Sequence, residues 1–167
     1  MKAESATVFR SMTALKTWVN KTRAKKVVLT NGCFDPLHVG HVRYLRGAKE
    51  HGDYLVVAVN DDKSTRALKG PNRPVSKAGA RARVIAGLKM VDAVLVFGAP
   101  NVSGVLNRLR PAFHAKGTDY TRETVPELET SRALGIETII VGDPKDHGST
   151  EIVERLSTSN RKGKESR

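Results

Sequence analysis

Residues 30–41 read TNGCFDPLHVGH, and this stretch indicates the fold more strongly than any other part of the chain. It follows a short apolar segment of strand character, Val27–Thr30, and leads into a segment of helical character, Pro36–His51. Gly32 permits a tight turn between the two. The sequence therefore predicts a strand, a turn and a helix. The free N–H groups and the dipole at the start of such a helix attract anionic groups such as phosphate.

Strand and helix patterns continue to alternate after this unit. Residues 70–74 contain a glycine and two prolines, which interrupt regular secondary structure. Further strands are predicted at Tyr54–Asn60, Ala93–Phe97, Ala112–Lys116 and Glu137–Val141. Helices are predicted between them and after the last one, at about residues 76–90, 102–109, 126–134 and 149–156. The expected fold class is α/β, with a single open parallel five-stranded sheet of Rossmann-like type and helices on both faces. Such sheets bind ligands outside the carboxyl ends of the strands, where the strand order reverses.

Three parts are expected along the chain: an N-terminal amphipathic helix within residues 1–25, one domain at 26–156 and a basic disordered tail at 157–167. The helix is predicted from about Phe9 to Thr22, because apolar residues recur there at helical spacing. Its apolar stripe has to pack somewhere, and we expect a homodimer. A mitochondrial targeting peptide is the alternative for this basic segment.

The composition narrows the possible partners. The formal net charge is +12, but residues 1–26 carry seven Lys or Arg against one acid and residues 155–167 carry five against one. Because most of the excess lies on the flanks, nucleic acid is not the expected partner; the more basic half of the body, residues 43–89, suits a small anionic ligand. The single cysteine excludes an intramolecular disulfide, and no apolar run is long enough to cross a membrane. We expect a cytoplasmic protein.

His38 and His41 are the most informative side chains. They are three residues apart and therefore share one face of the first helical turn, where two imidazoles can donate hydrogen bonds to phosphate oxygens. Gly40 between them is unfavourable in a helix and indicates a close approach of a ligand. Asp35 is expected to cap this helix and Pro36 to occupy its first turn. The two histidines could mimic zinc ligands, but no third ligand has suitable spacing, and we expect no metal ligands in the protein.

These residues resemble the His-x-Gly-His signature of the cytidylyltransferase-like nucleotidyltransferase superfamily. The resemblance covers about residues 26–156, and the order of its blocks is most similar to the heptose 1-phosphate adenylyltransferase branch without a kinase domain. The other blocks are VAVNDD at 57–62, LKGPNRPV at 68–75, Arg81, Val91-Asp92, AKGTDY at 115–120 and Ser149-Thr150.

The resemblance implies an enzyme that transfers AMP from ATP to a sugar phosphate and releases pyrophosphate, with Mg²⁺ bound by the substrate phosphates. It implies that the catalytic residues are His38, His41, Lys69 and Arg81. It implies nucleotide contacts from Asn31, Gly32, Cys33, Phe34, Gly40, Ser149 and Thr150. On the substrate side it implies Asp35, Asp62, Arg73, Lys116 and Asp119.

This chain departs from the family pattern in places. Gly79-Ala80 stands where the family has acidic or amide residues before the arginine, and Glu151 follows Ser149-Thr150. Two alternatives stay open. One is a CTP-dependent glycerol-3-phosphate or polyol-phosphate cytidylyltransferase. The other belongs to a different class, a nucleotide- or nucleic-acid-binding module without turnover.

Overall fold

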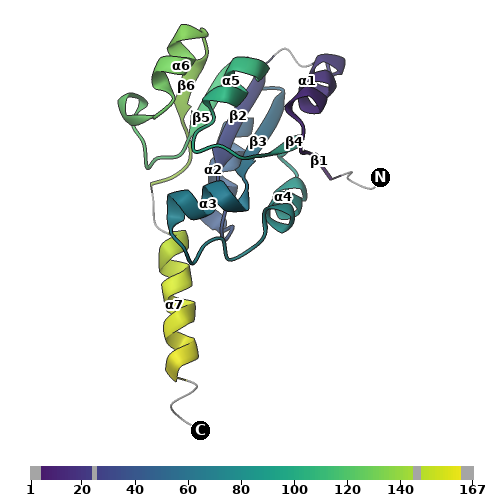
Figure 1. Cartoon of the computed structure of the whole chain (residues 1–167). Coiled ribbons are helices and arrows are strands. Elements are labelled where there is room, and N and C mark those ends of the chain that lie inside the picture. The colour runs from purple at the N-terminus through teal and green to yellow at the C-terminus, as the bar shows by residue number, and fades with distance from the viewer. Residues whose placement is uncertain (1–4, 24–25, 145–147, 163–167) are drawn as a thin grey trace.

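A six-stranded, fully parallel sheet forms the centre of the computed structural model, which describes residues 5–23, 26–144 and 148–162 (Figure 1). Its strand order is β1-β4-β3-β2-β5-β6. The strands are β1 (Thr7–Phe9), β2 (Val27–Gly32), β3 (Tyr54–Asn60), β4 (Ala93–Phe97), β5 (Phe113–Lys116) and β6 (Glu137–Ile140). The chain moves from β2 to β3 and β4 on one side, then returns to β5 on the other. The strand order therefore reverses at β2.

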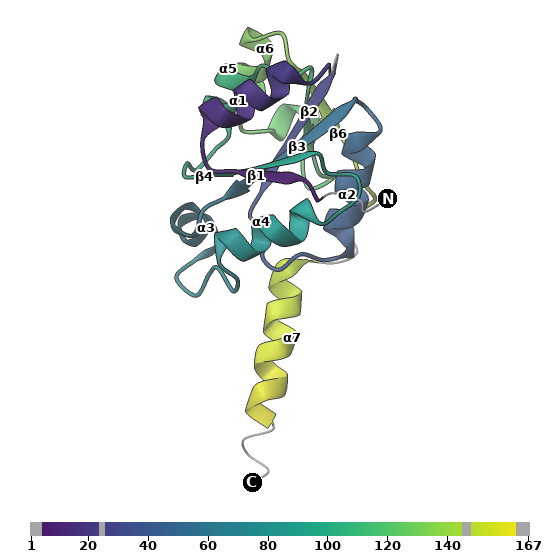
Figure 2. The same cartoon turned by 90° about the vertical axis from the view of Figure 1, so that its right-hand side faces the viewer.

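Helices cover both faces of the sheet (Figures 1 and 2). They are α1 (Met12–Lys21), α2 (Val39–Lys49), α3 (Asp62–Lys69), α4 (Ala78–Ala86), α5 (Ser103–Leu109), α6 (Leu128–Ala133) and α7 (Ser149–Lys162), with a 3₁₀ turn, η1, at Arg122–Thr124. Neighbouring strand residues point to opposite faces: Val28 packs with the core on the side of α2 and α4, and Leu29 with the core on the side of α1 and α5. Burial on both faces explains why the strands lack polar alternation.

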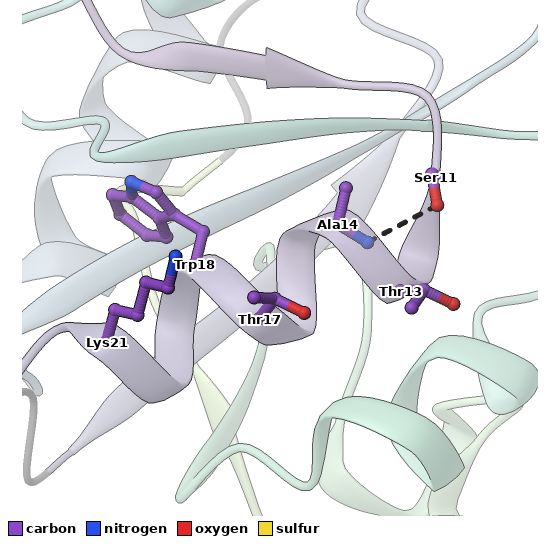
Figure 3. Close-up of a pocket in the computed structure, with 6 residues that line it drawn as sticks. All are labelled: Ser11, Thr13, Ala14, Thr17, Trp18 and Lys21. Carbon is purple, nitrogen blue, oxygen red and sulfur yellow. Dashed lines mark hydrogen bonds between the residues drawn. The ribbon is translucent and has the colours of Figure 1, made fainter.

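The expected number of five strands is wrong, because the N-terminal segment adds a sixth. Residues Thr7–Phe9 pair in parallel with Ala93–Leu95, and Ala6 N–H donates to Ala86 O at 2.9 Å. The predicted helix therefore starts later, at Met12, after Ser11 caps it by accepting a hydrogen bond from Ala14 N–H at 3.3 Å (Figure 3). The segment is part of the domain: β1 covers the edge of β4, and α1 packs beside α5.

The apolar stripe of α1 is covered within the chain, since Leu15 is fully buried in the core beside β4 and α5. We expect Leu15→Ala to lower the free energy of unfolding by about 2–5 kcal/mol, because truncating a buried leucine leaves a cavity. Urea denaturation followed by circular dichroism measures this loss. Lys16→Ala, on the exposed side of the same helix, is the control and should change stability by less than about 0.5 kcal/mol. An equally small loss for Leu15→Ala would mean that α1 does not pack stably on the sheet.

The last helix also differs from expectation. It continues to Lys162, so residues 157–162 are helical, whereas the expected tail at 163–167 lies outside the described residues. Both views show α7 extending away from the sheet and its covering helices (Figures 1 and 2). None of the helices in the described ranges is long and apolar enough to span a membrane.

Candidate active site

A cavity of about 910 Å³ opens at the carboxyl ends of the strands, where the strand order reverses. Its walls come from the loops after β2, β5 and β6, from the start of α2, from the end of α3 and from the first turns of α7. Most of the predicted site residues line it: Asn31, Gly32, Cys33, Phe34, Asp35, His38, Gly40, His41, Lys69, Lys116, Asp119 and Thr150. Ser149 begins α7 next to Thr150. Asp62, Arg73 and Arg81 are not among the lining residues.

The two histidines form a stacked pair at the start of α2. Their ring centroids are 3.8 Å apart, with the planes tilted by 31°. Gly40 N–H donates to His38 Nδ1 at 3.2 Å, and His38 N–H donates to His41 Nδ1 at 3.3 Å. An imidazole nitrogen that accepts a hydrogen bond carries no proton, so in each neutral ring the proton sits on Nε2. The backbone thus selects the tautomer in which Nε2 is an N–H donor.

His38 itself is the N-cap of α2, which corrects the expectation that Asp35 caps this helix. The helix begins at Val39, three residues after Pro36. The Asp35 carboxylate cannot serve as a cap, because groups from residues 73–76 occupy it. Arg73 Nε donates to Oδ2 at 2.9 Å, Val75 N–H to Oδ2 at 2.8 Å and Ser76 N–H to Oδ1 at 2.9 Å.

A side chain at Gly40 would crowd the ring of the neighbouring His38. A Cβ at Gly40 would lie 3.0 Å from Cε1 and 3.1 Å from Nδ1 of the His38 ring. This gives a reason within the protein itself for a glycine at this position, in addition to the close ligand approach that we expected.

We expect Gly40→Ala to lower turnover by about tenfold or more while leaving thermal stability unchanged or slightly raised. Alanine favours the helix, but its methyl group must push the His38 ring away from its position, and small displacements of catalytic groups are costly. Steady-state kinetics and a melting curve measure both effects. Gly104→Ala is a matched control, because Gly104 is also the second residue of its helix and a Cβ there meets nothing within 4 Å. Equal rates for both variants would contradict the expected role.

The resemblance implies a substrate-side role for Arg73 and a catalytic role for Arg81, but both side chains are engaged in buried contacts within the protein. The Arg73 side chain is 9% exposed and forms an ion pair with the buried Asp35, and its Nη2 also donates to Asp35 O. Arg81 is buried as well; its Nη1 donates to Cys33 O at 2.6 Å and to Asn60 O at 2.8 Å, and its Nη2 pairs with Asp62 at 3.0 Å. Both guanidinium groups therefore tie the loops around the cavity together. Asp62 also accepts from Ala78 N–H at 2.7 Å and is not among the residues that line the cavity.

Lys69 differs from the two arginines because its side chain is exposed and lines the cavity. It is the last residue of α3, which ends at Gly70 with a φ of +104°, a backbone conformation that favours glycine. The following loop is attached to Asp35 through Arg73. Lys69 can therefore approach an anionic ligand, and the loop that follows it is anchored at Arg73.

The wall of the cavity at the end of β5 contains a buried ion pair, of which the sequence analysis named only Lys116. Lys116 Nζ lies 3.2 Å from Glu127 Oε2, and the two side chains are 7% and 2% exposed. Burial lowers the pKa of Lys116, and the Glu127 carboxylate opposes this shift. Behind the pair, His114 Nε2 lies 3.2 Å from Asn31 Oδ1, and burial, with the nearby charge of Lys116, lowers the pKa of His114 to about 4. His114 is therefore neutral near pH 7.

Glu127 and Arg43 are lining residues that the sequence interpretation missed. Arg43 Nε lies 3.5 Å from Asp143 Oδ2, and Asp143 also lines the cavity. It stands two positions after His41, and this nearness to the histidine pair was the available signal. Glu127 follows Pro126 without any motif, so only the folded chain reveals its approach to Lys116.

The helix α7 brings mixed charge to the cavity. Thr150, Glu151 and Glu154 line its wall, and the Glu151 carboxylate lies 2.7 Å from Arg155 one turn later. The ion pair with Arg155 offsets the negative charge that Glu151 brings close to the proposed phosphate site.

A second hollow lies on the outer side of α1, between Trp18, Lys21 and the first turn of the helix (Figure 3). It is far poorer in converging polar groups than the cavity at the strand ends. The cavity containing the histidine pair is therefore the candidate active site.

Comparisons with known proteins identify the family. The family described as "Cytidylyltransferase-like" matches residues 29–160. The bifunctional protein HldE of Syntrophotalea carbinolica is 42% identical over 138 residues, and that of Azotobacter vinelandii is 43% identical over 134 residues. These matches cover 83% and 80% of this chain but only 28% of either relative.

Solved structures show the same fold. A lipopolysaccharide core biosynthesis protein from Thermoplasma volcanium matches with a TM-score of 0.62 and 25% identity, over 72% of this chain and 98% of that one. Pantoate-beta-alanine ligase from Francisella tularensis matches with a TM-score of 0.62 and 13% identity, over 87% of this chain and 72% of that one. At 13% identity, this second likeness concerns the fold alone.

Proposed function

Because this chain belongs to the cytidylyltransferase-like family, we propose that it is an adenylyltransferase that moves AMP from ATP to a sugar phosphate such as heptose 1-phosphate and releases pyrophosphate. The observation that carries this proposal is the His38–His41 pair, whose backbone hydrogen bonds place the ring protons on Nε2 beside a helix start that favours phosphate. The block order that resembles the heptose branch supports the choice of acceptor.

The chemistry requires no protein nucleophile. A phosphate oxygen of the acceptor attacks the α-phosphorus of ATP, the new P–O bond forms, and pyrophosphate leaves in line. Negative charge grows on the α-phosphate oxygens, and N–H donors from His38 and His41 stabilise it. Lys69 would contact the phosphates from the α3 side of the cavity.

Magnesium enters this proposal with the nucleotide. Among the residues that the structure describes, no three or more His, Cys, Asp or Glu side chains are grouped so that they could hold a metal ion. We propose that phosphate oxygens and water are the ligands of Mg²⁺ and that the ion would neutralise charge on the β- and γ-phosphates.

A pyrophosphate-release screen tests the proposal. ATP and CTP are each combined with a panel of sugar and polyol phosphates that includes heptose 1-phosphate. We expect release with ATP and a sugar phosphate. Release with CTP and glycerol 3-phosphate would instead identify a cytidylyltransferase. Nucleotide binding without any release would favour a module without turnover.

The assembly and the cellular location stay predictions. We keep the homodimer and the cytoplasm as expectations of the same proposal, although the apolar stripe of α1 that led us to expect a dimer is covered within the chain. Light scattering on the purified full chain measures its mass in solution. A monomer at micromolar concentration would contradict the dimer.

A further inference from the structure

The ion pair between Lys116 and Glu127 lies in the cavity wall at the end of β5. Lys116 is the last residue of β5, and Glu127 is the N-cap residue of α6. Both line the cavity, although their side chains are almost entirely buried. The histidine pair and Lys69 come from α2 and α3 and line the same cavity. The helix α2 packs on β5 beside the ion pair, because Tyr44 OH donates to Ala115 O at 2.7 Å.

Glu127 is held in place independently of Lys116. Its Oε1 accepts a hydrogen bond from Val102 N–H at 3.3 Å, at the residue before α5 begins, while Oε2 faces Lys116. Lys116 Nζ also lies 5.1 Å from the centroid of the Tyr120 ring. The ammonium is thus fixed between a carboxylate and an aromatic face. An ammonium has three N–H donors, so it can still bind an oxygen of a ligand in the cavity.

The other titratable groups near Lys116 do not supply its counter-charge. His114, on the same strand, is neutral near pH 7 because burial lowers its pKa to about 4. Tyr44 from α2 donates its OH to Ala115 O at 2.7 Å, and burial raises its pKa, so it is also neutral. Asp119 is exposed. Glu127 is therefore the buried negative charge that stabilises the Lys116 ammonium against desolvation.

We propose that Lys116 binds the phosphate of the acceptor and that Glu127 is the positioning residue that keeps the Lys116 ammonium charged and directed into the cavity. This proposal rests on the proposed function, because it assigns the acceptor to this wall. It predicts that losing the Glu127 charge weakens acceptor binding only where Lys116 becomes neutral, that is, at higher pH.

The test uses Glu127→Gln, which keeps a side-chain oxygen for Val102 N–H but removes the negative charge. Carbon-13 NMR of the lysine Cε atoms, assigned with Lys116→Arg, should show the Lys116 pKa falling by about one unit or more. Above that pKa, KM for the sugar phosphate should rise by about tenfold or more, and it should recover at lower pH. The KM for ATP should change little.

Two further variants separate this role from a structural one. Glu129→Gln changes an 88% exposed carboxylate on the same helix and should leave both the titration and KM unchanged. Lys116→Arg combined with Glu127→Gln should restore acceptor binding at high pH, because arginine stays protonated. A loss in Glu127→Gln that is equal at all pH values, or that appears in KM for ATP, would overturn the proposal.

A separate measurement of phosphate binding distinguishes a failure of this proposal from a failure of the proposed function. In wild type with a non-hydrolysable ATP analogue bound, inorganic phosphate should move the Lys116 Cε signal. It should move this signal less in Glu127→Gln above its new pKa. If the panel shows no turnover but the signal moves, the proposed function fails and the phosphate site stands. If the signal does not move in wild type, the site fails.

Discussion

Replacing His41 by alanine is expected to lower turnover by about 10²–10³-fold, equivalent to about 3–4 kcal/mol, and to change nucleotide affinity little. The N–H groups at the start of α2 already attract phosphate in the ground state. The charge that develops on the α-phosphate is present only in the transition state, where loss of one well-placed donor is most costly. Single-turnover rates and nucleotide titrations of the same preparations measure the two quantities. His38→Ala should behave alike.

The variants must separate catalysis from helix capping, because both rings accept backbone hydrogen bonds through Nδ1. His38→Asn supplies an oxygen that can cap α2, so it should recover the stability lost in His38→Ala without recovering the rate. His51→Ala, an exposed histidine after α2, is the control and should react at the wild-type rate. If His38→Asn and His41→Ala also react at that rate, the pair has no catalytic role.

The alternation of strands and helices was sufficient to predict a parallel α/β fold, because that pattern is local. The missing strand shows where local reasoning ends. Val8, Met12, Leu15 and Val19 have helical spacing, so the sequence predicts a helix from Phe9, yet Thr7–Phe9 pairs with the edge of β4. Three residues carry too little periodicity to indicate a strand, and the pairing partner lies more than 80 positions away.

That the rings of His38 and His41 lie together could be predicted, because the two residues are three positions apart at the start of a helix; their chemical role stays a prediction. The surroundings of Arg73 and Arg81 could not be predicted, because they depend on distant residues. The sequence shows a basic residue near a proposed phosphate site, but not that Asp35, 38 positions earlier, pairs with Arg73. The sequence alone does not distinguish an arginine that is buried against a carboxylate from an arginine that faces a ligand. The same reason hides Glu127 beside Lys116.

Removing the Asp35 carboxylate is the second large effect that we expect. Asp35→Ala should lower the free energy of unfolding by about 3–5 kcal/mol, because it leaves the buried Arg73 guanidinium without a counter-charge. It also leaves Val75 N–H and Ser76 N–H without their acceptor. Urea denaturation of the variant against wild type measures the loss. Arg73→Met should be destabilising for the converse reason, since it leaves a buried carboxylate.

The double variant Asp35→Asn with Arg73→Met decides whether the two residues act as a pair. It removes both charges together, so its loss of stability should be clearly smaller than the sum of the single losses. Arg132→Met is a matched control from an exposed pair, with side chains 66% and 88% exposed, and should cost less than about 1 kcal/mol. Full stability in Arg73→Met together with a raised KM for the sugar phosphate would instead support the substrate-side role that the resemblance implies for Arg73. The buried ion pair predicts that Arg73→Met lowers stability. Turnover would then fall because Lys69 and the 30–41 loop no longer keep their relative positions.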